Sequence, residues 1–310
     1  MVNKVLNAYN VEKLRFTAVD NCGRPIYGPC STLITECFET IEQNADIEEG
    51  DAIERVNANG KSCFYVPPNK RDHGFNIVAM LNNKNPALYT MLNPNWQKII
   101  DEIGDMIGFE HASVVSQTAG VAIEGWEMVA GAECDTEGDG MWNYFLYPWV
   151  ANFAAGDAER GNSGHQDEWN GHTIGGSNWG VGPYDVRYDA TDGITPTGLL
   201  TPVKKNSHWI DLATTMAPPE TTDQCIPLSN PAGPPATITS CDAGTLEVGV
   251  TATHARPMQI DWGDGSAPAA LVTAVESTKT YAAAGRYIIT VRFTDAAQEE
   301  TYLVAEVPCA

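Results

Sequence analysis

A proline-dense segment, about two thirds of the way along the chain, constrains the fold more than any other feature. It runs from Ala217 to Pro227 and continues from Ser229 to Pro235. Proline fixes φ and removes a backbone donor, so we expect regular elements to stop here and a semi-stiff, extended linker to replace them. The sequence therefore predicts two domains, residues 1–216 and residues 237–310, joined by a linker over residues 217–236.

The overall charge excludes some classes of function. The 310 residues include 40 acidic and 18 basic side chains, which gives a formal net charge of −22. Phosphate contacts need Lys and Arg, so this balance argues against a protein that grips nucleic acid. The N-terminus lacks an apolar run of signal-peptide length, and no segment is long enough to span a bilayer. We expect a soluble product made in the cytoplasm.

The cysteines are scattered and form no C-x-x-C pair, so a zinc site is not expected. In a chain long enough to bury a large core, most of these thiols are expected to be small, buried apolar side chains. Cys241 and Cys309 bracket the second domain, and a disulfide between them stays an open alternative. The eight positions are Cys22, Cys30, Cys37, Cys63, Cys134, Cys225, Cys241 and Cys309.

The second domain alternates apolar and polar residues, which is the signal for half-buried strands. Leu246, Val248 and Val250 should point to one face, and the pattern recurs over residues 287–293 and 302–307. No helical period interrupts it. We expect a β-sandwich of about seven short strands.

The first domain is also expected to be mainly β, with strands near residues 34–41, 63–66 and 75–81. Residues 93–107 differ, because their apolar side chains recur at helical spacing behind an Asn-Pro start signal. We expect one amphipathic helix here, with its apolar stripe on the sheet. Residues 155–183 are rich in Gly, Asn, Ser and Trp, and they predict a long ordered loop.

Three segments imitate functional motifs. Residues 55–62 end in Gly-Lys-Ser like a phosphate-binding loop, but the first glycine is missing and two prolines follow, so we interpret them as a hairpin turn with Asn59-Gly60 at its tip. Residues 135–140 resemble the start of a calcium loop, but Leu146 stands where a bidentate Glu belongs. His165, Asp167, Glu168 and His172 lack metalloprotease spacing, and no nucleophile signature accompanies them. No catalytic residue, metal or cofactor is therefore expected.

One pattern in the second domain is more specific. Residues 259–266 and 280–291 resemble the PKD family of immunoglobulin-like modules, which are non-catalytic additions to many unrelated proteins. Ile260 and Trp262 should enter the core, and Asp264-Gly265 should form a tight turn. The residues that carry the resemblance are Ile260, Asp261, Trp262, Gly263, Asp264, Gly265, Tyr281, Gly285 and Tyr287.

Three stretches of the first domain, residues 57–63, 78–92 and 171–184, resemble the major tail protein of siphophages. This resemblance implies a virion structural protein with a β-sandwich or barrel and one flanking helix, assembled as hexameric rings that stack into a tail tube. Viral DNA would pass through the tube without specific binding, and other phage tail proteins would be partners. The N-terminal segment and the loop Ile47 to Gly60 would contact the next ring. The PKD-like domain would lie outside, where it could touch the host cell surface.

An acidic wall would repel a passing duplex, so part of the densest acidic run is expected to face the lumen. An ordinary solvated strand is an equal alternative. The run comprises Glu36, Glu39, Glu42, Asp46, Glu48 and Glu49. Two other functions stay open: an extracellular enzyme or adhesin with an accessory PKD domain, and another virion decoration protein.

Overall fold

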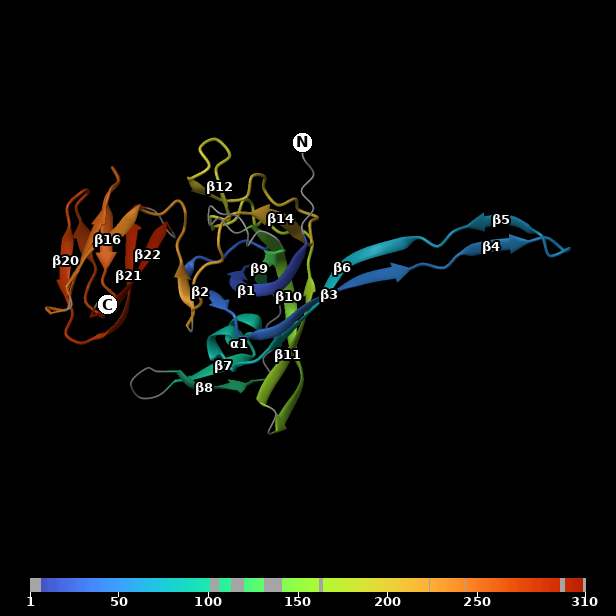
Figure 1. The fold of residues 1–310 in the computed structure, drawn as a ribbon, viewed down its shortest axis with the longest axis horizontal. Coiled ribbons are helices and arrows are strands. Elements are labelled where there is room, and N and C mark those ends of the chain that lie inside the picture. Colours follow the sequence, from blue (N-terminus) through green and yellow to red (C-terminus); the bar gives the residue numbers. More distant parts are fainter. Residues whose placement is uncertain are drawn as a thin grey trace.

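The protein consists mainly of β-strands (Figure 1). The structure is a computed structural model. It describes residues 7–100, 106–112, 120–130, 141–161, 164–222, 224–242, 244–295 and 299–308. For residues 106, 157–161, 164 and 165 it describes the backbone alone. Within these residues, α1 (Pro86–Leu92) is the one α-helix. The mainly-β class predicted from the sequence is confirmed.

One large antiparallel sheet organises residues 8–228. We call this part of the chain, apart from the hairpin that projects from it, the body. The strands of the sheet follow the order β15, β2, β1, β9, β10, β11, β6 and β3, and β14 pairs with β10 outside this path. Their bounds are β1 (Ala8–Val19), β2 (Gly28–Thr35), β3 (Phe38–Glu49), β6 (Lys70–Leu81), β9 (Gly120–Val129), β10 (Trp142–Gly161), β11 (Gly164–Thr173), β14 (Ile210–Thr214) and β15 (Ile226–Leu228).

In the central strands of this sheet both faces are buried, whereas the edge strand β3 is mostly exposed. Successive residues of a strand point to opposite sides, so each central strand contributes to two cores. In β9, Ile123 packs into one core cluster, whereas Trp126 packs into another. The first cluster is covered by α1, and the second by an irregular segment that contributes Trp179 and Val203. That segment contains the short pair β12 (Arg187–Tyr188) and β13 (Pro196–Thr197).

The helix begins at the Asn-Pro pair of residues 85–86, not at the Asn-Pro pair of residues 93–94 where the sequence predicted a helix. Asn85 caps α1, since its side chain accepts hydrogen bonds from the backbone N–H groups of Ala87 and Leu88, and proline occupies the first turn. The helix ends at Asn93. The helix predicted over residues 93–107 is therefore wrong.

A hairpin of β7 (Trp96–Ile100) and β8 (Met106–His111) occupies that region instead. Trp96 packs edge-on against Tyr89 and Phe109, with ring centroids 5.7 and 5.0 Å away. Ile99 and Ile100 stay exposed, so the residues that suggested a buried helical stripe do not share a buried face.

The long loop predicted over residues 155–183 is wrong for most of its length. β10 and β11 form an antiparallel hairpin that extends to Gly161 and Gly164, and β11 continues to Thr173. The segment becomes irregular only after this strand.

Residues 236–307 form two facing sheets, which we call the C-terminal sandwich. One sheet has the order β16, β17, β20, and the other has the order β19, β18, β21, β22. A single apolar cluster from both sheets lies between them. The bounds are β16 (Ala236–Asp242), β17 (Glu247–Ala252), β18 (Met258–Asp261), β19 (Ala269–Leu271), β20 (Ser277–Thr280), β21 (Gly285–Phe293) and β22 (Glu300–Val307).

The PKD-like residues occupy the positions expected of them. Ile260 and Trp262 are 1% and 5% exposed, and Gly265 has a φ of 78° in the turn that follows. Tyr281 donates a hydrogen bond to the backbone oxygen of Trp262 at 2.9 Å and stacks on Tyr287. The remaining members are Asp261, whose side chain accepts from the N–H of Gly263; Asp264, which pairs with Lys279; and Gly285, which opens β21.

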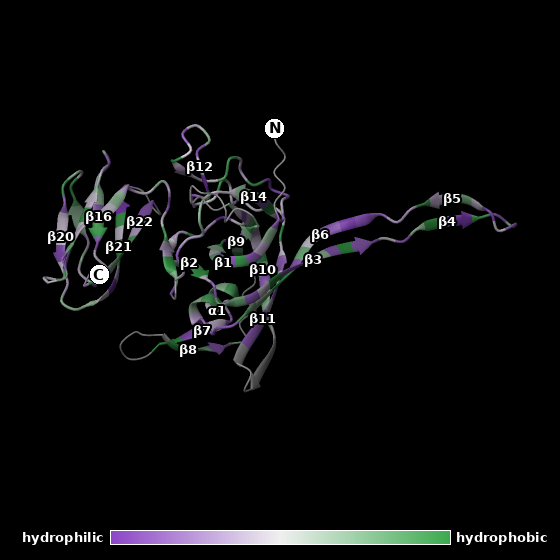
Figure 2. Cartoon of the chain, in the orientation of Figure 1, coloured by the Kyte–Doolittle hydropathy of each residue, from purple (hydrophilic) through white to green (hydrophobic). Residues whose placement is uncertain are grey.

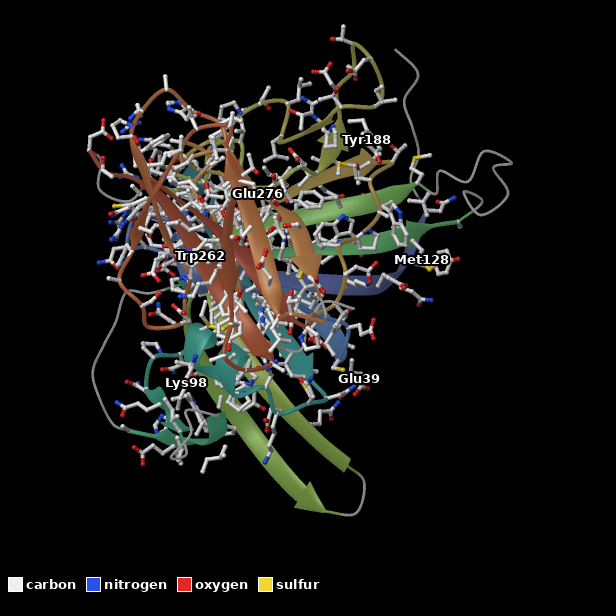
Figure 3. The ribbon with its side chains drawn as sticks, turned by 90° about the vertical axis from the view of Figure 1, so that its left-hand side faces the viewer. Glu39, Lys98, Met128, Tyr188, Trp262 and Glu276 are labelled. Carbon is white, nitrogen blue, oxygen red and sulfur yellow. A yellow bond between two sulfur atoms is a disulfide. The ribbon has the colours of Figure 1, made fainter. Side chains whose placement is uncertain are left out.

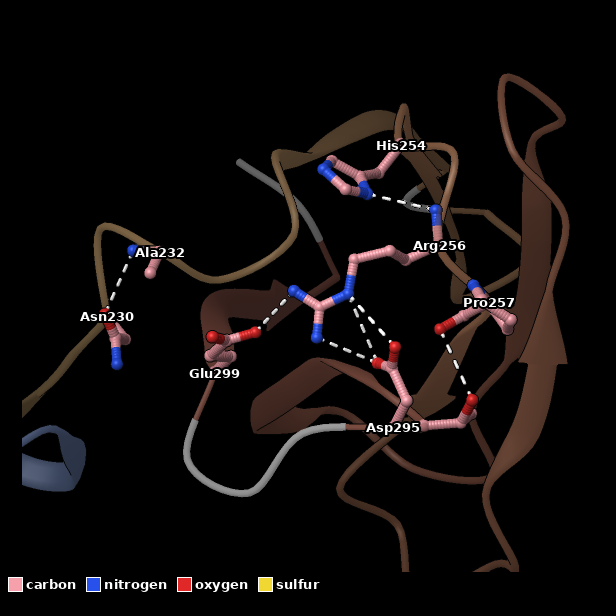
Figure 4. A network of polar contacts seen from close by, with 8 residues as sticks. Asn230, Ala232, His254, Arg256, Pro257, Asp295 and Glu299 are labelled. Carbon is pink, nitrogen blue, oxygen red and sulfur yellow. Dashed lines mark hydrogen bonds and ion pairs between the residues drawn. The ribbon is translucent and has the colours of Figure 1, made fainter.

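A charged cluster closes one end of the sandwich (Figure 4). Arg256 Nη1 lies 2.6 Å from Glu299 Oε2, and its Nη2 lies 2.8 Å from Asp295 Oδ1. The guanidinium carbon sits 3.9 Å from the ring centroid of Phe293. This arginine therefore links the start of β18 to the segment between β21 and β22.

The cysteine predictions need correction. Cys30 on β2 and Cys225 form a disulfide across 195 residues, and Cys241 is also disulfide-bonded. Cys309 and Cys134 lie outside the described residues. Among the described residues, the free thiols are exposed rather than buried; they belong to Cys22, Cys37 and Cys63.

The proline-dense segment is also more structured than expected. Ile226–Leu228 forms β15, which pairs with β2 at the edge of the body sheet. The expectation that regular elements stop throughout residues 217–236 is therefore wrong at this strand.

Candidate assembly surface

A long β-hairpin projects from the body; we call its residues 47–72 the arm (Figure 1). β3 and β6 pair up to Glu49 and Lys70, and the hairpin continues through β4 (Ile53–Val56) and β5 (Ser62–Val66). The ten residues from Ile47 to the tip would span about 30 Å at the rise of a β-strand. The arm thus places its tip far from the body core.

The tip is an ordered turn. Asn57 N–H donates to the backbone oxygen of Lys61 at 2.8 Å, and the Asn57 side chain accepts from the N–H groups of Asn59 and Lys61. Gly60 has a φ of 74°, a conformation that favours glycine. The interpretation of residues 55–62 as a hairpin rather than a phosphate loop is confirmed.

Hydrophobic residues alternate with hydrophilic ones along the arm, far from the body (Figure 2). Residues paired across two strands share a face, so Ile53, Phe64 and Val66 form one apolar strip. Each is exposed, at 52%, 54% and 39% respectively. Tyr65 is 58% exposed as well. Such a concentration of apolar surface on a thin hairpin is typical of a segment that binds another protein surface.

The base of the arm is fixed tightly. The ladder shifts register between Asp46 and Ile47, which re-aims the strand where it leaves the sheet. Gly74 has a φ of 104°, and a Cβ there would lie 2.4 Å from His208 Nδ1. The N–H of Phe75 donates to Thr173 Oγ1 at 2.8 Å. These contacts set the direction in which the arm projects.

The six acidic residues singled out in the sequence lie along one edge of the molecule. Glu36 precedes β3, which is the edge strand of the sheet, and the other five lie on it. Several of the six have polar partners. Glu36 and Glu39 accept hydrogen bonds from the side chains of Thr221 and Gln166. Asp46 faces His172, Glu48 faces His73, and Glu49 forms an ion pair with Lys70. Glu42 and Glu39 are exposed. The strand is acidic, and of these partners only Lys70 carries a fixed positive charge, so most of its negative charge is not neutralised by them.

The polar residues of β11 do not converge on a catalytic site. Asp167 is buried and accepts a hydrogen bond from Tyr89, and burial raises the pKa of its carboxyl while Lys84 lowers it. Glu168 accepts from Asn170, and His172 contacts Asn76 on the neighbouring strand. The side chain of His165 and residues 135–140 lie outside the described part of the structure. Among described residues, no group of three His, Cys, Asp or Glu could hold a metal ion.

Sequence reasoning missed a buried charged network between β1 and β9. Arg15 and Glu124 are directly paired across these strands and make two hydrogen bonds of 2.7 and 2.6 Å. Tyr144 donates to the same carboxylate at 2.6 Å, and Tyr184 lies under the guanidinium. Burial raises the pKa of Tyr184 to about 12. A lone Arg inside the apolar run 14–19 was the signal that could have revealed it.

Compared with known proteins, the chain matches no family model and no curated sequence. In the described residues, no helix is long and apolar enough to cross a membrane. The arm and the acidic edge strand are thus the surfaces from which a function can be argued.

Proposed function

We propose that this chain is a structural subunit that assembles with copies of itself into rings that stack as a tube, in the manner of the tail tubes that its sequence resembles. The arm is the observation that carries the proposal. Every residue from 50 to 69 is exposed except Pro68, which is half-buried. A two-stranded hairpin is marginally stable by itself in water, so a long one that is rich in apolar residues is best explained by burial on a neighbour.

The position of the arm suits a head-to-tail contact. A second exposed apolar group lies on the β7–β8 hairpin, away from the side on which the arm projects (Figure 1). It consists of Ile99, Ile100 and Ile107, which are 41%, 58% and 66% exposed. When two different patches of identical subunits meet, the contact can close into a ring or repeat along an axis. Such repetition would build a tube of stacked rings, and the resemblance to tail tubes implies that each ring is a hexamer.

The charge of the chain supports a conduit for DNA. With a net charge of −22, the subunit would repel a duplex rather than hold it. We place the acidic edge strand β3 toward the lumen and the C-terminal sandwich outside, where it could contact a host surface and other tail proteins. Many copies on one tube would strengthen a weak contact through multivalency.

Electron microscopy of two variants tests the proposal. The arm can be shortened by replacing residues 50–69 with Asn-Gly between Glu49 and Lys70, which already face each other across the ladder. The full-length protein at high concentration should form rings or tubes, whereas the shortened protein should stay monomeric with an unchanged circular dichroism spectrum. Rings from both proteins, or monomers from both under every condition, would contradict the role of the arm.

The disulfides indicate an oxidising location, which a second candidate, an extracellular adhesin, would share with a virion protein. Cys30–Cys225 is a disulfide and Cys241 is disulfide-bonded, and such bonds persist in secreted proteins and on virions. The same microscopy separates the two functions, because an adhesin would remain monomeric at concentrations at which a tube subunit assembles.

A further inference from the structure

A short strap fastens the C-terminal sandwich to the body; we define it as residues 224–234. On the body side, Cys225 is bonded to Cys30 of β2. β15 then pairs with β2 at only two positions, Ile226 with Thr32 and Leu228 with Gly28. Just before the strap, Thr222 is hydrogen-bonded to Ile34 of β2. Within the strap, the disulfide is the covalent side-chain link that reinforces this very short strand.

On the other side, the strap is bound to β22 of the sandwich. Ser229 Oγ accepts from the N–H of Tyr302 at 2.9 Å, and the N–H of Asn230 donates to the backbone oxygen of Glu300 at 3.0 Å. Thr301 Oγ1 donates to the oxygen of Pro234 at 2.5 Å. The strap therefore moves with the sandwich if its body side is released.

Next to the strap, the body and the sandwich are separated by a cleft of about 510 Å³. Arg24, Tyr27 and Trp179 line it from the body, and Glu300 and Tyr302 line it from β22. An open cleft supplies little packing to hold the two parts in one orientation. The strap carries this task instead.

One sulfur of the bond is exposed and has a cation beside it, whereas the other, on Cys225, is half-buried against the body core. Cys30 is exposed on β2, and Lys98 Nζ on β7 lies 3.8 Å from its sulfur. Figure 3 shows Lys98 on the hairpin below the sandwich. A nearby ammonium group stabilises a thiolate, so Cys30 is a good leaving group in thiol–disulfide exchange.

We propose that the Cys30–Cys225 disulfide is a reducible latch that holds the sandwich in one orientation on the body, and that thiol–disulfide exchange frees the sandwich while both parts stay folded. The partner is a small dithiol or a dithiol protein. Its thiolate attacks the sulfur of Cys225, the S–S bond breaks, and Cys30 leaves as a thiolate beside Lys98. The second thiol then resolves the mixed disulfide, so that two electrons pass to the protein and the dithiol becomes a disulfide.

Hydrogen exchange read by mass spectrometry tests the latch on the full chain, with and without dithiothreitol. On reduction, the amides of Ile226 and Leu228 should exchange at least tenfold faster, whereas those of β9 and β21 should keep their protection. Cys225→Ser should reproduce the reduced pattern without reductant, and Cys241→Ser should leave the strap protected in the oxidised protein. Unchanged strap protection on reduction, or loss of protection throughout the body, would overturn the proposal.

The role of Lys98 has its own readout, the rate at which dithiothreitol opens the bond. Lys98→Gln should slow this rate several-fold, and Lys98→Arg should restore most of it. Lys61→Gln, which removes a cation from the distant arm, should leave the rate unchanged. If Lys98→Gln reacts at the wild-type rate, Cys30 is not the assisted leaving group.

Discussion

Truncating Phe64 on the arm should weaken assembly without weakening the fold. The side chain is 54% exposed, and an aromatic side chain can bury about 150–250 Å², so about 110 Å² remains for a neighbour to cover. At about 25 cal/mol per Å², burying that area on a neighbour contributes about 2–3 kcal/mol to the free energy of assembly. Replacing Phe64 by alanine should remove about 2 kcal/mol of it. The critical concentration of assembly should therefore rise roughly 30-fold.

Sedimentation velocity over a concentration series measures that shift, and urea unfolding of the monomer should change by less than about 0.5 kcal/mol, as expected for a surface position. Two valines supply a matched control. Val56 on the arm is 61% exposed, and Val272 on the sandwich is 59% exposed. Val56→Ser should raise the critical concentration and Val272→Ser should not. Equal effects of the two, or no effect of Phe64→Ala, would refute the assignment of the arm as the contact surface.

Three further predictions concern the body. Arg15→Met should destabilise it by about 3–5 kcal/mol in urea unfolding because Glu124 stays buried without its counter-charge, and adding Glu124→Leu should recover much of the loss. Since the pKa of Tyr184 is raised to about 12 in the fold, stability should fall as pH rises from about 10 to 12. Tyr184→Phe should make that fall less steep but not abolish it, because burial also raises the pKa of Tyr144 and Tyr147. Gly74→Val should disorder the base of the arm, seen as faster hydrogen exchange of Phe75, because His208 and a positive φ leave no room for a side chain.

The strands and the sandwich could be predicted from the sequence because their signals are local. The alternation over residues 287–293 is a direct consequence of one buried face in β21, and Asn59-Gly60 specifies its turn without help from the rest of the chain. Ile260 and Trp262 were expected in the core and lie there.

The errors arose where packing overrides composition. Glycine-rich residues of β10 and β11 suggested a loop, yet Gly171 pairs with Ile77 in the sheet. Glycine is needed there because a Cβ would come within 2.7 Å of the Phe153 ring. The helical spacing over residues 93–107 was misleading, since Ile99, Ile100 and Ile107 are exposed and do not enter the core. The arm's length and the latch depend on pairings between distant residues, which no local pattern encodes.

Photo-cross-linking from the arm tests the central claim most directly. A benzophenone amino acid at position 64 should, after irradiation of the assembled protein, yield dimers and higher multimers, with cross-linked peptides that come from a second copy of the chain. The same group at Tyr188, an exposed position on the body, serves as the control. If the protein assembles through the arm, the yield of intermolecular cross-links from position 64 should be well above the yield from position 188. Equal yields from the two positions, or no cross-links from position 64 at concentrations that give assembly, would contradict the claim.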